Sequence, residues 1–173
     1  MVYLTYLTDT VHLRTSTFIE RDGMNKYAKF GLMILSSTVL MFGLMYLNVY
    51  QPDHILFSQT RAYMALIMGA SMAFLMLIFM LSMYTKRSIN AAIFIGSAFV
   101  FIAALWLVRS QATVDDVSYM KAMIPHHSIA ILTSERAHIS DPRVRKLADD
   151  IASTQRREIA EMKALVEELE KRP

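Results

Sequence analysis

Three long runs without a charged residue constrain this chain more than any other feature. Each run is long enough, at 1.5 Å per residue, to cross a hydrocarbon core about 30 Å thick as a helix. The sequence therefore predicts three transmembrane helices, at Phe30–Val49, Ala62–Tyr84 and Ala91–Val108. The third run can be extended back to Ile89 before a charge is met.

The charged residues lie outside those runs and divide the chain into three parts. Residues 1–29 carry seven charges, residues 30–108 carry four, and residues 109–173 carry 22, eleven of each sign. We expect an N-terminal segment, a three-helix membrane domain and a C-terminal helical domain with these bounds. Residues 1–23 are interpreted as a start-site extension, because Met24 looks like a natural translation start. The net charge of +3 arises entirely before residue 109, which argues against a nucleic-acid partner.

Positive residues in the loops predict an orientation in the membrane. Four of them precede the first run, and Lys86 and Arg87 form the short turn between the second and third runs. Only Arg61 lies between the first and second runs. The positive-inside rule then places the N-terminus and the Lys86 turn in the cytoplasm. We expect a multi-pass protein of a bacterial inner membrane, with its C-terminal domain in the periplasm.

The chain contains no cysteine but has 14 methionines. The absence of thiols excludes disulfides, thiolate zinc sites, iron–sulfur clusters and cysteine nucleophiles. Methionine is then the remaining soft metal ligand. Five methionines recur at every fourth residue from Met64 to Met80 in the second predicted span. They are either a path for Cu(I) or Ag(I) through the membrane or adaptable apolar packing, and we favour the packing.

Two helix-start signals predict a helical hairpin after the third run. The sequence Thr-Val-Asp-Asp at 113–116 fits a capping box, and Asp-Pro at 141–142 suits the first residues of another helix. We expect helices over about 114–138 and 142–171, joined antiparallel by a short turn. The predicted fold class is therefore all-α. Because a lone hairpin buries little apolar surface, self-association into a ferritin-like four-helix bundle is the simplest way to complete it.

The antiparallel register predicts that sulfur and imidazole side chains meet across this hairpin. With the turn centred near residue 140, residue i of the first helix lies level with about residue 280 minus i of the second. One zone about two turns tall then contains the side chains of Met120, Met123, His126 or His127, Gln155, Glu158 and Met162. A kink at Pro125 would bring both imidazoles to one ion. Gln155 and Glu158 are the weaker ligand candidates.

Three interpretations of this zone remain open. Thioether and imidazole groups without thiolate suit Cu(I) or Ag(I), and imidazole also accepts Cu(II). Alternatively, the histidine and methionines form a structural core in a membrane scaffold. Third, Glu135-x-x-His138 matches the di-iron pair of ferritin-like bundles, but Glu135 should lie level with Arg143, Arg145 and Lys146 and form a salt bridge. No catalytic triad, phosphate-binding loop or paired carboxylates are apparent, so we predict that the protein is not an enzyme.

Three motifs of the C-terminal domain resemble a known family. They are Met-Lys-Ala-Met-Ile-Pro-His-His at 120–127, Asp-Pro-Arg-Val-Arg-Lys-Leu at 141–147 and Gln-Arg-Arg-Glu-Ile-Ala-Glu-Met-Lys at 155–163. Their order and spacing resemble a bacterial family catalogued as domain of unknown function number three-hundred-and-five, which is grouped with ferritin-like bundles and includes periplasmic copper-binding and copper-resistance proteins.

The resemblance covers about residues 113–169 and implies a function for the hairpin. It implies copper-ligating roles for Met120, Met123, His126, His127 and Met162. The expected protein binds copper or silver for sequestration, delivery or resistance, with the lipid bilayer, a second copy of itself and other copper-handling proteins as partners. The three predicted spans lie outside the resemblance.

Overall fold

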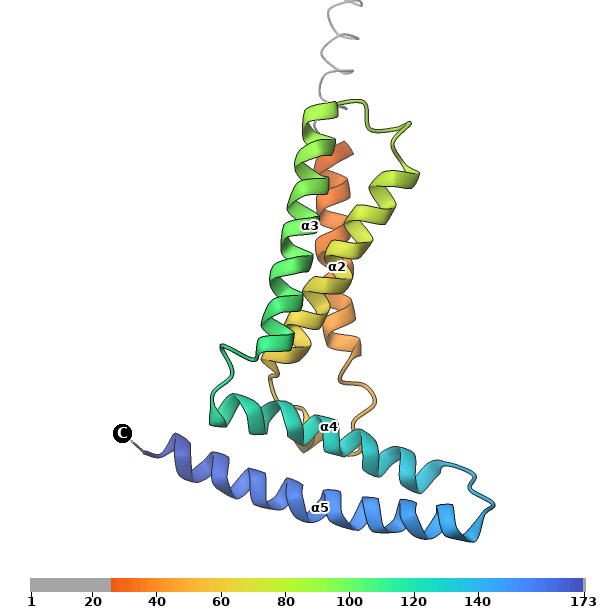
Figure 1. Cartoon of the computed structure of the whole chain (residues 1–173), viewed down its shortest axis with the longest axis vertical. Helices are drawn as coiled ribbons and strands as arrows, with labels where there is room; N and C mark the ends of the chain where they lie inside the picture. The colour runs from red at the N-terminus through yellow and green to blue at the C-terminus, as the bar shows by residue number, and fades with distance from the viewer. Residues whose placement is uncertain (1–25, 173) are drawn as a thin grey trace, which may run out of the picture.

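The computed structural model describes residues 26–172, and all regular structure in that range is helical. Three long helices stand side by side: Lys26–Leu44, α2 (Gln59–Phe79) and α3 (Arg87–Ser110). Each is long and apolar enough to cross a membrane, which confirms the prediction of a multi-pass membrane protein. A hairpin of α4 (Asp116–Arg136) and α5 (Pro142–Glu170) lies across one end of this bundle, with α4 nearer to it (Figure 1). The predicted extension at residues 1–23 lies outside the described residues.

The membrane helices do not coincide with the uncharged runs. The first helix ends at Leu44 rather than Val49, because apolar residues continue into the following loop. Helix α2 begins earlier than predicted, because the side chain of Ser58 accepts a hydrogen bond from the N–H of Arg61 and caps the helix. Arg61 therefore lies in the first turn of α2 and not in the loop. An absence of charge locates a span, whereas the caps determine where its helix begins.

Helix α2 packs closely on the first helix through a glycine. A Cβ atom on Gly69 would lie only 2.3 Å from Oγ1 of Thr38, so the two backbones approach where no larger side chain fits. Two turns further along, Leu77 is fully buried, and Met76 and Met80 pack against the same apolar cluster. These two methionines of the predicted ladder therefore contribute to helix packing.

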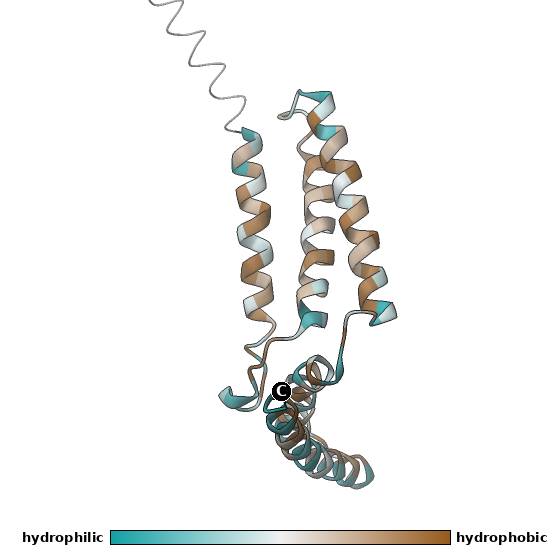
Figure 2. Ribbon diagram, turned by 90° about the vertical axis from the view of Figure 1, so that its left-hand side faces the viewer, coloured by the Kyte–Doolittle hydropathy of each residue, from teal (hydrophilic) through white to brown (hydrophobic). Residues whose placement is uncertain are grey.

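The outer surface of the three-helix bundle is apolar. On α3, Ile95 is 71% exposed and Phe99 is 72% exposed. Figure 2 shows hydrophobic residues along the length of the three helices and more hydrophilic residues along the hairpin. Large apolar side chains at such exposure are typical of a surface that faces lipid.

Acidic side chains start both helices of the hairpin. Asp141 caps α5 as predicted, and Pro142 occupies the first turn. Helix α4 is capped by Asp115, which accepts a hydrogen bond from the N–H of Ser118 at 2.7 Å. The prediction of a cap at Thr113 is wrong, because the hydroxyl of Thr113 lies instead 2.8 Å from the hydroxyl of Tyr63.

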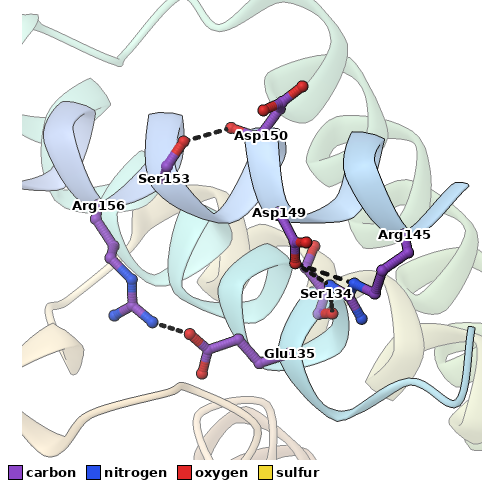
Figure 3. Close-up of polar contacts among 7 residues, drawn as sticks. All are labelled: Ser134, Glu135, Arg145, Asp149, Asp150, Ser153 and Arg156. Atoms are coloured by element: carbon purple, nitrogen blue, oxygen red, sulfur yellow. Dashed lines mark hydrogen bonds and ion pairs between the residues drawn. The ribbon is translucent and has the colours of Figure 1, made fainter. Parts of the chain in front are cut away.

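The ion pairs between the two hairpin helices differ from the expected ones. Glu135 pairs with Arg156, and not with the positive residues at the start of α5 (Figure 3). Arg145 instead donates to the backbone carbonyl of Ser134 at 2.7 Å and to the carboxylate of Asp149 at 2.6 Å. The guanidinium of Arg145 is thus already occupied at the end of α4, which leaves Glu135 to a residue further along α5.

The loop between the first helix and α2 folds back onto the hairpin. At its centre is a short 3-10 helix, η1 (Pro52–His54). The backbone N–H of Tyr50 donates to Oγ of Ser128 at 2.6 Å, and Nδ1 of His54 lies 2.9 Å from the same oxygen. This contact, which was not predicted from the sequence, joins the membrane domain to the middle of α4.

Candidate metal centre

A groove of about 550 Å³ runs along the hairpin between α4 and α5. Side chains from both helices line it: Asp116, Tyr119, Met120, Met123 and His127 from α4, with Glu158, Glu161, Met162, Leu165 and Leu169 from α5. The structure thus brings together four of the five predicted ligands, namely Met120, Met123, His127 and Met162, and the weaker candidate Glu158. The antiparallel register explains this meeting, because α4 and α5 run in opposite directions from one short turn.

His127 stands between the two walls of the groove. Its Nε2 lies 2.9 Å from a carboxylate oxygen of Glu158, and its Nδ1 lies 2.9 Å from the backbone carbonyl oxygen of Met123. A protonated ring donates to both oxygens, whereas a neutral ring donates to only one of them. Because both nitrogens already have partners, a metal ion at either nitrogen has to replace one of these contacts. Gln155 lies at the edge, with its amide 3.5 Å from the same Glu158 oxygen.

His126 does not line this groove. Its side chain is exposed, and its ring centroid is 6.1 Å from that of His127 with the two planes at 66°. Helix α4 runs without a break through Pro125, so neighbouring side chains stay about 100° apart around its axis. Only one of the two imidazoles, that of His127, therefore lines the groove in this structure. A ligand role for His126 stays a prediction.

The donors in the groove distinguish soft ions from hard ones. Within residues 26–172, no group of three or more His, Asp or Glu side chains is arranged to hold a metal ion. Hard ions such as Mg²⁺, and the di-iron pair of ferritin-like bundles, depend on several oxygen ligands. The groove also presents three methionine thioethers, and thioether sulfur is a ligand type that Cu(I) favours. The carboxylates of Asp116, Glu158 and Glu161 make the surroundings favourable for a cation.

The side of α4 bearing Ser128 is sealed by the loop. His54 is only 5% exposed against Ser128. Burial lowers the pKa of His54, the positive charges of Lys163 and Arg156 lower it further, and Asp53 opposes them. The imidazole is therefore neutral at pH 7. This contact was not predicted from the sequence, although an Asp-His pair in the short polar stretch between two apolar runs was the available signal.

Comparisons with known proteins support the division of the chain at the hairpin. Residues 116–173 match a family described as Domain of unknown function (DUF305). The chain is therefore a helical membrane protein in which three long apolar helices precede a segment that matches the DUF305 family.

One curated relative extends the comparison. Uncharacterized protein L153 of Acanthamoeba polyphaga mimivirus is 41% identical over 71 residues, which is 40% of this chain and 47% of that protein. The chain thus spans less than half the length of this relative. No solved structure matches the chain.

Proposed function

We propose that this protein is a membrane-anchored binding protein for Cu(I), or for Ag(I) as its close analogue. The observation that carries the proposal is the composition of the groove. Three thioethers from two helices, those of Met120, Met123 and Met162, face one cavity together with the imidazole of His127. This donor set suits a soft monovalent ion, and the imidazole also accepts Cu(II). The role is sequestration, delivery or resistance rather than catalysis.

Binding in this groove uses side chains that already face it. The methionines supply sulfur, and His127 supplies nitrogen once it leaves Glu158 or the carbonyl of Met123. The freed carboxylate of Glu158 remains beside the ion and balances its charge.

The proposed location follows from the two ends of the bundle. The first helix and α3 both begin at the end far from the hairpin (Figure 1), and Tyr27 and Asn90 hydrogen-bond there at 2.8 Å. The positive residues of Lys86 and Arg87 belong to the same end. By the positive-inside rule that end is cytoplasmic, so the hairpin lies in the periplasm of a bacterial inner-membrane protein. Other copper-handling proteins of that compartment are the expected partners.

The test is a Cu(I) titration of the full chain in detergent, against a competing chromophoric chelator. The double variant Met120→Leu/Met162→Leu removes two sulfurs and nearly conserves side-chain volume. We expect it to lower the affinity at least tenfold. Met64→Leu/Met83→Leu is the matched control, because these methionines are exposed on the membrane domain, and it should leave the affinity unchanged. Equal affinities in both variants would overturn the proposal.

A second candidate function has its own observation. Both nitrogens of His127 already have partners within the protein, which is the arrangement of a structural core in a scaffold or interaction subunit. Separate histidine variants distinguish the two functions. If the groove binds Cu(I), His127→Ala weakens binding more than His126→Ala, because only His127 lines the groove. If the protein is a scaffold, His127→Ala lowers thermal stability and the wild type binds no Cu(I).

A further inference from the structure

We propose that a second copy of this chain covers the groove, so that each metal site is closed by residues of the other copy. The inference rests on the proposed function for the metal, whereas the contact between copies rests on the hairpin surface alone. Four large apolar side chains of α5 are exposed beside the groove: Val144 (49%), Leu147 (59%), Ile151 (38%) and Leu165 (42%).

These four residues form one stripe along α5. At about 100° per residue they fall within a sector of roughly 60° around the helix axis. The residues of α5 buried against α4, which are Ala148, Ala152, Ile159 and Val166, occupy the adjacent sector. The apolar face of α5 is therefore wider than α4 covers. The uncovered part continues into the groove through Leu165 and Leu169, which line it.

No described part of this chain covers the stripe. The loop from the membrane domain contacts the opposite side of the hairpin through Ser128, and Lys163 pairs there with Asp53 at 2.6 Å. The hairpin helices lie one beyond the other along the direction of the spans (Figure 1). The loop and the groove therefore lie on the two lateral sides of the hairpin. A two-fold axis along the membrane normal then turns two grooves toward each other with both copies in the same orientation.

The area of such a contact suits a pair of copies. From Val144 to Leu165 the stripe is about 32 Å long, and a layer of two helices is about 20 Å wide. Each copy then covers about 600 Å², or about 1,200 Å² in total, which is the lower limit for a specific and stable interface. Two hairpins joined in this way form an antiparallel four-helix bundle.

Charges at the two ends of the stripe are complementary in this arrangement. Arg143, whose guanidinium also pairs with Asp141, and Glu161 lie on the same edge of α5, one at each end of the stripe, and both are exposed. A two-fold axis level with about residue 152 places Arg143 of each copy beside Glu161 of the other. This level lies within about one turn of the middle of the stripe, so charge and apolar contact specify nearly the same register.

The same register completes the metal site. Val144 and Leu147 of one copy come level with residues 157–160 of the other, where His127 faces Glu158. Two apolar side chains then cover an otherwise open groove and exclude water from its donors. Exclusion of water strengthens the interaction between an ion and its ligands. The pair of copies therefore holds two separate sites, each built by one copy and covered by the other.

Single cysteines test the contact, because the chain has none of its own. The full chain in detergent and in lipid nanodiscs is treated, without metal, with a short bismaleimide crosslinker. Ile151→Cys lies close to the proposed axis and should give crosslinked dimers. Ser153→Cys is the control on the outer face of α5, is also exposed, and should give few. Absence of dimers with Ile151→Cys, or equal yields from both variants, would overturn the proposal.

A charged variant separates the contact from the metal function. Leu147→Glu should convert dimers to monomers in mass photometry with unchanged helicity, because Leu147 contributes little to the fold of one copy. If the site is shared, Cu(I) affinity falls at least fivefold in this variant. Dimers without any Cu(I) affinity would reject the metal function and retain the contact. Protection of Ile151→Cys by lipid in nanodiscs without crosslinking would assign the stripe to the membrane surface and reject the contact.

Discussion

Ser128→Ala is expected to loosen the hairpin from the membrane domain. The hydroxyl of Ser128 is fully buried, accepts from the N–H of Tyr50 at 2.6 Å and lies 2.9 Å from Nδ1 of His54. Its removal leaves two polar groups without their partner, and a buried unsatisfied group costs about 1–3 kcal/mol. His54 is buried and bears this cost, whereas Tyr50 is only half-buried and can turn to water. We therefore expect the docking of the loop to lose about 1–3 kcal/mol.

Hydrogen exchange at the amide of Tyr50 measures this loss directly. Since 1.4 kcal/mol corresponds to a factor of ten, exchange should become about 5- to 150-fold faster in Ser128→Ala. Ser134→Ala is the matched control on the same helix, because Ser134 contacts Arg145 through its backbone carbonyl, which the substitution retains. Unchanged protection of the Tyr50 amide in Ser128→Ala, or an equal effect in the control, would refute the conclusion that the Ser128 hydroxyl holds the loop against α4.

Three further predictions concern the same docking and the membrane domain. The pKa of His54 is lowered in the folded chain, so the unfolded chain binds a proton more readily. The contribution of His54 to stability is therefore full above the ordinary pKa near 6.5 and falls as the pH drops toward the folded pKa. Thermal unfolding at pH 7.5 and 5.5 should show this loss, and His54→Gln should reduce it. Lys163→Ala should cost less than about 1 kcal/mol in the same assay, because its partner Asp53 is largely exposed. Gly69→Val should destabilise the chain by about 1–3 kcal/mol through the clash with the first helix, whereas Gly96→Val, with nothing within 4 Å, should not.

Features that depend on local pattern could be predicted from the sequence. The three charge-free runs gave three membrane helices, and the Asp-Pro pair at 141–142 gave the start of α5. The meeting of Met120 and Met162 in one groove also followed, because the two helices run antiparallel from one short turn.

Features that depend on contacts between distant segments could not be predicted. Tyr50 and Ser128 are 78 residues apart, and no periodicity links them. The partner of Glu135 was assigned from a register centred on residue 140, but the contact between His127 and Glu158 shows that residues of α4 meet residues further along α5 than that register predicts, and Arg156 pairs with Glu135. The orientation of His126 depended on whether Pro125 bends α4, and the sequence does not determine whether the surrounding packing keeps the helix continuous.

The two sides of α4 differ in how far they are covered, and this difference favours a function on the groove side. On the side that carries Ser128, the loop satisfies buried polar groups and covers apolar ones, so that surface is already used in folding. On the other side, sulfur, imidazole and carboxylate groups share an open groove beside exposed apolar residues such as Leu147. A chain that seals one side so fully and leaves the other uncovered has a surface available for an ion, a second copy or both. Because the sealed side also fixes α4 to the membrane domain, it holds the groove in one orientation relative to the bilayer, which lets two anchored copies meet groove to groove.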